Sequence, residues 1–261
     1  MTAPDPAFAD PRLARLYDPL EDDRADLDAY VSMTDEFGAH SVVDVGCGTG
    51  EFAVRLVAHA QRRGGSLSVI GVDPAAASIE LARAKPNAEH VRWVIGTAPD
   101  LIDGARPVGD VDLVVMTANV AQVFVGDDEW LDTLRACRSM LDRAGHLVFE
   151  TRDPARRAWE DWSGDALRSI DDVPDVGPVE TCIEVTSVEL PLVTFDAWYR
   201  FLDTGDTVRS TSTLRFRDRA EIESTLAEAG FAVDEIRDAP DRLGREFVVI
   251  ARPSSPASAG V

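Results

Sequence analysis

The chain has 261 residues, of which 45% are hydrophobic, and its formal net charge is −21. This length is enough for one large core, or for a core with an appended lobe. No apolar run approaches the roughly 20 residues that a transmembrane helix needs, so we expect no membrane association. Nucleic-acid binding depends on clustered lysine and arginine, so the acidic charge also argues against a nucleic-acid partner.

The three cysteines and four histidines are scattered along the chain. Cys47, Cys137 and Cys182 are odd in number and have no metal-ligand spacing, so we expect no metal site. A reduced, cytoplasmic location fits this pattern. The N-terminal residues also lack the basic and apolar segments of a secretion signal.

The first part of the chain alternates between helical and strand-like segments. Residues 10–38 predict two helices, and the segment that follows, up to about residue 151, predicts strands separated by helices. The expected strands cover residues 41–45, 67–72, 91–95, 111–116 and 146–150, and the expected helices cover residues 52–59, 75–85 and 127–143. Strands alternating with helices predict an α/β fold with a parallel sheet and helices on both faces.

The pattern changes after Thr151. A short helix is expected near 154–162, and three β-rich stretches then predict an antiparallel meander. A last helix and two last strands return to the first pattern, so the meander is expected to be an insertion. The later elements are the stretches 179–190, 192–203 and 207–217, the helix 218–229, and the strands 231–236 and 246–251.

A glycine-rich loop, Asp44-Val-Gly-Cys-Gly-Thr-Gly50, joins the first expected strand to a helix. Such a loop presents backbone N–H groups to a ligand, and glycine lets the backbone approach closely. A dinucleotide-binding loop would have its third glycine at position 51, but Glu51 stands there and would repel a pyrophosphate. A phosphate-binding P-loop is not favoured either, since no Gly-Lys-Ser/Thr follows.

A cationic ligand without phosphate suits this loop better. Asp44 ends the first strand, and Asp73 ends the next one, where it could accept hydrogen bonds from ribose hydroxyls. Two acids at neighbouring strand ends are costly to bury unless they are paired. S-adenosylmethionine (SAM), with its sulfonium, ammonium and ribose groups, fits these residues. Asp73 could also simply cap the helix that follows it.

Four segments, in this order, resemble the class I SAM-dependent methyltransferases: Val42–Glu51, Gly71–Pro74, Asp110–Met116 and Ala144–Phe149. The resemblance covers about residues 40 to 151, and residues 218–252 resemble the end of that family's sheet. It implies a Rossmann-like sheet with an antiparallel last strand, SAM as the cofactor and S-adenosylhomocysteine (SAH) as the product. The segment from Phe149 to Pro154 resembles bacterial small-molecule methyltransferases.

The resemblance also implies a division of the chain. Residues 1–40 would form an N-terminal helical cap, and residues 41–252 a SAM-binding methyltransferase domain. The segment at about 152–217 would be a substrate-side insertion. The polar, proline-bearing tail 253–261 is expected to be flexible.

Cofactor-binding roles follow from the same motifs. Gly46, Cys47 and Gly48 would line the methionine moiety, with Asp44 near its ammonium. Asp73 would hold the ribose, and the neighbouring Pro74 would contact the adenine.

Further roles fall on residues outside the glycine loop. Thr97 and Ala98 would contact the adenine, although the family often has an acidic residue where Thr97 stands. Asn119 and Val120 would meet the methionine amine, and Tyr17 would close over the cofactor. Asn119 could equally bond within its loop, and Tyr17 could be a core residue.

Methyl transfer is an in-line displacement at a carbon that the sulfonium already activates, so alignment can supply much of the rate. A base is needed only when the nucleophile carries a proton. The motifs therefore name no catalytic residue. The candidates near the expected methyl position are Tyr17, Gln122, Glu150 and Arg152.

The acceptor is expected to be a small-molecule metabolite with an O or N nucleophile. Methyltransferases acting on nucleic-acid bases often carry an Asn/Asp-Pro-Pro-aromatic signature after the fourth strand, where this chain has Thr117–Ala121. Two other functions remain open from the sequence, a SAM-binding protein without transfer activity and a nicotinamide-dependent oxidoreductase. The sequence does not select an oligomeric state.

Overall fold

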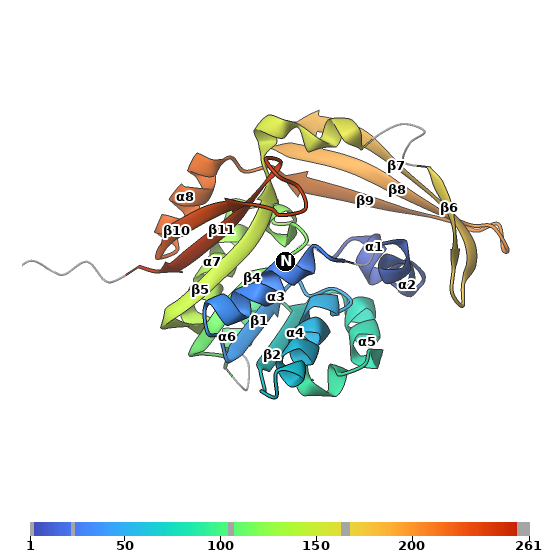
Figure 1. The fold of residues 1–261 in the computed structure, drawn as a ribbon. Helices are drawn as coiled ribbons and strands as arrows, with labels where there is room; N and C mark the ends of the chain where they lie inside the picture. The colour runs from blue at the N-terminus through green and yellow to red at the C-terminus, as the bar shows by residue number, and fades with distance from the viewer. Residues whose placement is uncertain (1–2, 22–23, 104–106, 163–167, 255–261) are drawn as a thin grey trace, which may run out of the picture.

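The structure is a computed structural model that describes residues 3–21, 24–103, 107–162 and 168–254. It contains two β-sheets, and Figure 1 shows the smaller one extending over the N-terminal helices α1 (Pro6–Ala9) and α2 (Pro11–Leu20). No helix in the described ranges is long and apolar enough to cross a membrane.

The main sheet contains the alternating strands that the sequence predicts. Its spatial order is β10-β11-β5-β4-β1-β2-β3. The strands from β5 to β3 pair in parallel, whereas β11 pairs antiparallel with both β5 and β10. The predicted fold class, with its antiparallel last strand, is confirmed. The bounds are β1 Ser41–Val45, β2 Ser68–Asp73, β3 Val91–Ile95, β4 Val111–Met116, β5 Leu141–Arg152, β10 Phe231–Asp238 and β11 Glu246–Pro253.

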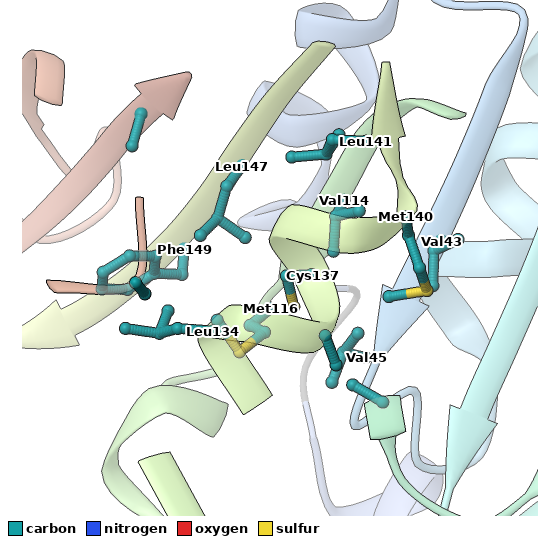
Figure 2. Packing of buried hydrophobic residues seen from close by; sticks show 14 of the residues in the cluster. Val43, Val45, Val114, Met116, Leu134, Cys137, Met140, Leu141, Leu147 and Phe149 are labelled. Carbon is teal, nitrogen blue, oxygen red and sulfur yellow. The ribbon is translucent and has the colours of Figure 1, made fainter. Parts of the chain in front are cut away.

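Helices cover both faces of the main sheet because its buried side chains alternate between two clusters. On β1, Val43 and Val45 belong to one cluster and Val42 to the other. The first cluster packs against α6 (Ala98–Asp103), α7 (Asp127–Met140) and α8 (Arg219–Glu228), and the second packs against α3 (Leu27–Glu36) and α4 (Glu51–Arg62). Figure 2 shows the first cluster, including Val43, Val45, Val114, Met116, Leu134, Cys137, Met140, Leu141, Leu147 and Phe149.

The loops that the sequence singles out lie together at the carboxyl ends of the strands of this sheet. Burying a Val, Leu or Phe side chain stabilises the fold by about 1.5–3 kcal/mol, so the two clusters hold the sheet rigidly. Ligands of open α/β sheets bind at this edge. The glycine loop lies there, between β1 and α4.

The N-terminal segment contains one helix more than predicted among the described residues. Residues 10–38 form α2 and α3 as expected, and the short α1 precedes them. Helix α2 begins after Asp10, whose side chain accepts a hydrogen bond from the Arg12 N–H at 2.8 Å. Helices α1 and α2 contact α5 (Ala76–Ala84) on one side and strands β9 (Thr207–Arg215) and β6 (Ser169–Val173) on the other.

The appended sheet confirms the predicted meander and extends it. Strands β6, β7 (Gly177–Glu189), β8 (Leu192–Phe201) and β9 pair antiparallel in this order. The prediction of three strands was wrong because it omitted β6. This strand contains Asp171 and Asp172, which disfavour strands, and it forms because β7 pairs with it.

Several boundaries differ from the predictions. Helix α7 ends at Met140 and β5 begins at once, because Leu141 pairs with Val111 of β4. Residues 154–162 form two short 3₁₀ turns, η3 (Pro154–Arg156) and η4 (Ala158–Asp161), instead of one helix.

At the C-terminus, β11 extends to Pro253 and the Ser254 N–H donates to the Gly230 carbonyl at 2.9 Å. The beginning of the predicted flexible tail 253–261 is therefore ordered. The rest of that tail, from residue 255 on, lies outside the described residues.

Candidate functional site

The glycine loop turns sharply from β1 into α4. Gly46, Gly48 and Gly50 have φ of 73°, 52° and 79°, a left-handed region that glycine adopts without strain. The loop is also close to the turn after β4, since a Cβ on Gly46 would lie 2.6 Å from Val120 Cγ1. Glycine is therefore required at position 46 both by its conformation and by the space available.

A cavity of about 340 Å³ lies at this loop, and we call it the glycine-loop cavity. It brings together most of the residues predicted to bind the cofactor, which come from segments far apart in the sequence. Those that line it are Tyr17, Gly46, Cys47, Gly48, Asp73, Pro74, Thr97, Ala98 and Val120.

Asp73 lies at the end of β2 and accepts two backbone hydrogen bonds. Its Oδ1 accepts from the Ala75 N–H at 2.8 Å, and its Oδ2 accepts from the Gly48 N–H at 2.9 Å. Burial raises the pKa of the carboxyl, although these two bonds favour the ionised form. Asp73 therefore does bond to the backbone at the start of α5, as the helix-capping alternative for this residue predicted. A carboxylate has about four acceptor positions, so the same side chain can still accept from a ligand.

Asp44 lies in β1, buried beneath the glycine loop. Neither of its carboxylate oxygens has a hydrogen-bond partner among the described residues. Burial, together with the negative charge of Asp73, raises the pKa of Asp44 to about 8. An ionised carboxylate without a partner is very costly inside a protein. Asp44 itself lies outside the lining of the glycine-loop cavity, which includes its neighbours Val45 and Gly46. Its negative charge is therefore suited to act on a cationic ligand group from behind the loop.

Cys47 lies in the same loop, and its environment does not favour a role as a nucleophile. Burial, followed by the charges of Asp44 and Asp73, raises the pKa of the Cys47 thiol well above its ordinary value. A thiol that stays protonated is a weak nucleophile.

Tyr17 is held over the glycine loop by its neighbour in α2. Asp18 Oδ1 accepts a hydrogen bond from the Thr49 hydroxyl at 2.6 Å, and Asp18 Oδ2 forms an ion pair with Lys85 at 2.8 Å. Lys85 also pairs with Glu51 at 2.9 Å. Burial raises the pKa of Tyr17 to about 12, so its hydroxyl remains protonated.

Thr97 contacts an acid that the sequence analysis did not single out. Its backbone N–H and its hydroxyl both donate to Asp100 Oδ2 at 2.8 Å. Asp100 is exposed and caps the first turn of α6. Asp100 therefore fixes the orientation of Thr97 and does not itself line the cavity.

A second cavity, of about 310 Å³, adjoins the first, and we call it the strand-end cavity. Tyr17, Arg24 and Ala118 line both cavities. The strand-end cavity is lined mainly by charged and polar residues, which are Tyr17, Glu21, Arg24, Asp26, Asn119, Glu150, Arg152, Asp241 and Arg242, together with Ala25 and Ala118.

Three of the four catalytic candidates line a cavity, and the fourth does not. Tyr17, Glu150 and Arg152 line the strand-end cavity, whereas Gln122 lines neither cavity and is fully buried. Gln122 is instead structural, because its Oε1 accepts from Arg152 Nη1 at 2.8 Å. Asn119 lies in the strand-end cavity and not in the glycine-loop cavity, although the prediction placed it against the methionine amine.

Two arginines at the end of β9 join the appended sheet to the loop after β4. Arg217 donates to the carbonyls of Ala121 and Phe124, at 3.2 and 2.7 Å, and Arg215 donates to that of Val125 at 2.9 Å. Burial lowers the pKa of Arg217 to about 10, which still leaves it charged at neutral pH. The appended sheet therefore holds a loop that lines the glycine-loop cavity.

Several residues that the sequence does not single out also line the glycine-loop cavity, among them Phe8, Arg24, Thr211 and Thr213. Thr211 and Thr213 lie on β9, the last strand of the appended sheet. No sequence motif around them predicts that they line a cavity. Arg24 follows α2, which lies within the predicted N-terminal helical cap. Only the packing of α1, α2 and β9 over the main sheet brings these residues to the cavity.

Part of the chain matches a known protein family. Residues 42–145 match the family model described as a methyltransferase domain. No curated protein matches the chain. Known structures show the same fold, and those below are under 25% identical in sequence.

A SAM-dependent methyltransferase from Clostridium acetobutylicum is 14% identical, with a TM-score of 0.72 over 94% of this chain and 98% of the other. The CcbJ methyltransferase from Streptomyces caelestis is 21% identical, with a TM-score of 0.72 and coverages of 93% and 96%. The sugar N-methyltransferase KedS8 from a Streptoalloteichus species is 18% identical, with a TM-score of 0.68 and coverages of 90% and 89%.

Residues 42–145 therefore match a methyltransferase domain in sequence, and the described chain has the fold of SAM-dependent methyltransferases. In that class of enzymes SAM is the methyl donor.

Proposed function

We propose that this enzyme transfers the methyl group of SAM to an O or N nucleophile of a small-molecule metabolite. The observation that carries the proposal is the pair of adjoining cavities, which share Tyr17, Arg24 and Ala118. In this proposal, SAM occupies the glycine-loop cavity and the acceptor occupies the strand-end cavity. The two reactants then meet at the shared residues, which suits an in-line displacement.

The residues of the glycine-loop cavity can hold each part of SAM. Gly46, Cys47 and Gly48 line the methionine moiety, and Asp44 neutralises its ammonium directly or through water. Asp73 accepts from the ribose hydroxyls. The adenine lies among Pro74, Thr97 and Ala98, and Val120 closes the methionine end. Tyr17, fixed by the bond between Asp18 and Thr49, covers the cofactor.

Size and charge support a small acceptor. A cavity of about 310 Å³ suits a small metabolite and is too small to enclose a folded macromolecular segment. The net charge of −21 disfavours a nucleic acid. The sugar N-methyltransferase KedS8, whose fold this chain shares, also supports a small polar acceptor.

The first test is binding, measured by calorimetry with SAM, SAH and NAD. We expect SAM and SAH to bind and NAD not to bind. The second test follows SAH release in the presence of small-molecule acceptors, tRNA and proteins. Turnover with tRNA or protein, and none with small molecules, would refute the proposed acceptor class.

A further inference from the structure

The arginines of the strand-end cavity are already paired with carboxylates. Arg24 pairs with Asp26 at 3.0 Å, and Arg242 pairs with Asp241 at 3.2 Å. Arg152 and Arg242 both pair with Glu246, at 3.6 and 2.8 Å. No arginine lining this cavity is therefore left to neutralise an anionic ligand.

Glu150 differs from these acids because no cation of the described residues is within ion-pair distance of it, and the charges of Arg242 and Arg152 act on it only from farther away. It is buried, with 5% of its surface exposed, and no residue in the described ranges forms an ion pair with it. Its hydrogen-bond donors are the Tyr30 hydroxyl and the Asn119 N–H, the latter at 3.2 Å. Both donors are neutral. An ionised carboxylate in such a place is costly until a cation reaches it.

Asn119 presents a second acceptor at the same cavity. Its Nδ2 donates to Glu246 Oε2 at 3.1 Å, which fixes the orientation of the amide. Its Oδ1 is buried and has no hydrogen-bond partner among the described residues. Buried polar atoms are nearly always bonded in native proteins, so this oxygen calls for a ligand donor. Glu150 and Asn119 together would bind a ligand group that is cationic and has several hydrogen-bond donors.

The backbone places these acceptors beside the glycine-loop cavity. Ala118, which lines both cavities, and Asn119 have φ of 54° and 60°. Two successive non-glycine residues in the left-handed region are strained, and such strain is kept where the surroundings impose it. This conformation directs the Asn119 N–H to Glu150 at the boundary between donor and acceptor.

We propose that the acceptor is an aliphatic amine, that Glu150 and Asn119 Oδ1 bind its protonated nitrogen, and that Glu150 removes the proton before transfer. This inference rests on the proposed function and narrows its acceptor to a nitrogen nucleophile. It makes Glu150 a catalytic residue, because the carboxylate contacts the reacting nitrogen. A phosphate or carboxylate ligand is disfavoured, since Glu150 would repel it.

The step is balanced in charge and atoms. The ammonium gives one proton to the Glu150 carboxylate and becomes a neutral amine. The nitrogen lone pair attacks the methyl carbon of SAM, a C–N bond forms, and the C–S bond breaks. SAH leaves as a neutral thioether, and the positive charge moves from sulfur to the methylated nitrogen. Burial raises the pKa of the Glu150 carboxyl above its ordinary value, which makes its carboxylate a stronger base.

The test uses matched acceptors and one substitution. SAH release is measured with amino sugars and amino alcohols, each beside the compound in which a hydroxyl replaces the amine. We expect turnover with the amine members and none with their hydroxyl partners. Transfer only to hydroxyl members, or no transfer to any amine by a protein that binds SAM, would overturn the amine assignment. A protein that does not bind SAM would instead overturn the proposed function.

The Glu150→Gln variant tests the role of the carboxylate. We expect an approximately 100-fold or greater fall in kcat/KM for the amine at pH 7, as is usual for the loss of a general base. The variant should bind SAM as the parent does, and its rate should recover as pH rises, because the free amine then forms without Glu150. The matched control is Glu184→Gln, an exposed residue of β7, which should keep the parent rate. An unchanged rate in Glu150→Gln, or a loss that pH does not restore, would refute the role.

Discussion

Replacing Asp44 by asparagine should stabilise the free protein and weaken SAM binding. In an unfolded chain the carboxyl ionises near pH 4, whereas in the folded protein burial raises its pKa to about 8. The folded-state pKa is thus above the unfolded one. Stability is therefore lost as pH rises from about 4 to about 8, because only the unfolded chain ionises freely in that window.

The magnitude follows from the pKa difference. Each pH unit between the two pKa values costs the folded state about 1.4 kcal/mol, so the cost at pH 7 is about 4 kcal/mol. Asparagine resembles the protonated acid in size and polarity but does not ionise. We expect Asp44→Asn to raise the free energy of unfolding by about 2–4 kcal/mol at pH 7 and by almost nothing at pH 4. In a chain of this size, each kcal/mol raises Tm by about 2–4 °C.

The assay is thermal unfolding of the free protein at a series of pH values, with calorimetry of SAM binding at each. The parent should bind SAM more tightly as pH rises toward 8, by up to about tenfold per unit, because binding draws Asp44 into its ionised form. The variant should show weak and nearly pH-independent binding. A variant that is less stable than the parent at pH 7, or a stability difference that does not change between pH 4 and pH 7, would refute the reasoning.

Asp112 provides the matched control, since its environment has the opposite effect. Burial alone would raise its pKa, but hydrogen bonds from the His40 and Ser41 backbone and the Ser41 hydroxyl outweigh it and lower the pKa. Its ionisation therefore stabilises the fold above pH 4. We expect Asp112→Asn to lose stability at pH 7, where Asp44→Asn gains it.

Three further substitutions test other parts of the site. Gly46→Ala should weaken SAM binding at least tenfold in calorimetry, because φ of 73° is strained for alanine and its Cβ would lie 2.6 Å from Val120 Cγ1. Asp73→Ala should weaken SAM binding by on the order of 1–3 kcal/mol, and unchanged affinity would refute its contact with the ribose. Arg217→Ala should lower the free energy of unfolding by about 2–4 kcal/mol in denaturant titrations, since two buried carbonyls lose their donors. Wild-type stability in that variant would show that the appended sheet does not hold the loop.

The sequence predicted the main sheet well because each of its signals is local. The strands at Ser41–Val45, Val91–Ile95 and Val111–Met116 have the bounds predicted from their apolar, β-branched runs. The predictions failed where pairing with a neighbouring strand outweighs local preference. Strand β6, with its two aspartates, and the start of β5 at Leu141 both form because a partner strand supplies their hydrogen bonds.

The residues at the glycine-loop cavity, where the methyl donor is proposed to bind, were predictable for a similar reason. A glycine loop and an acid at the next strand end lie a fixed distance apart whenever a βαβ unit forms, so Gly46, Gly48 and Asp73 meet at one cavity. The acceptor side was not predictable. Glu150 was predicted only as one of four catalytic candidates and Asn119 as a contact of the methionine amine, whereas the structure places both at the strand-end cavity and Gln122 in the buried interior.

By itself, the sequence determined the class of fold, the glycine loop and the kind of ligand that this loop suits, because these depend on residues close together in the chain. Only the tertiary structure decided which buried groups lack partners. Whether Glu150 has a cation beside it depends on where Arg152, Arg242 and Glu246 pair, and these come from β5, the loop before β11 and β11 itself. Pairing among distant segments leaves no periodic pattern in the sequence, and the proposed amine acceptor rests on the charge that this pairing leaves over.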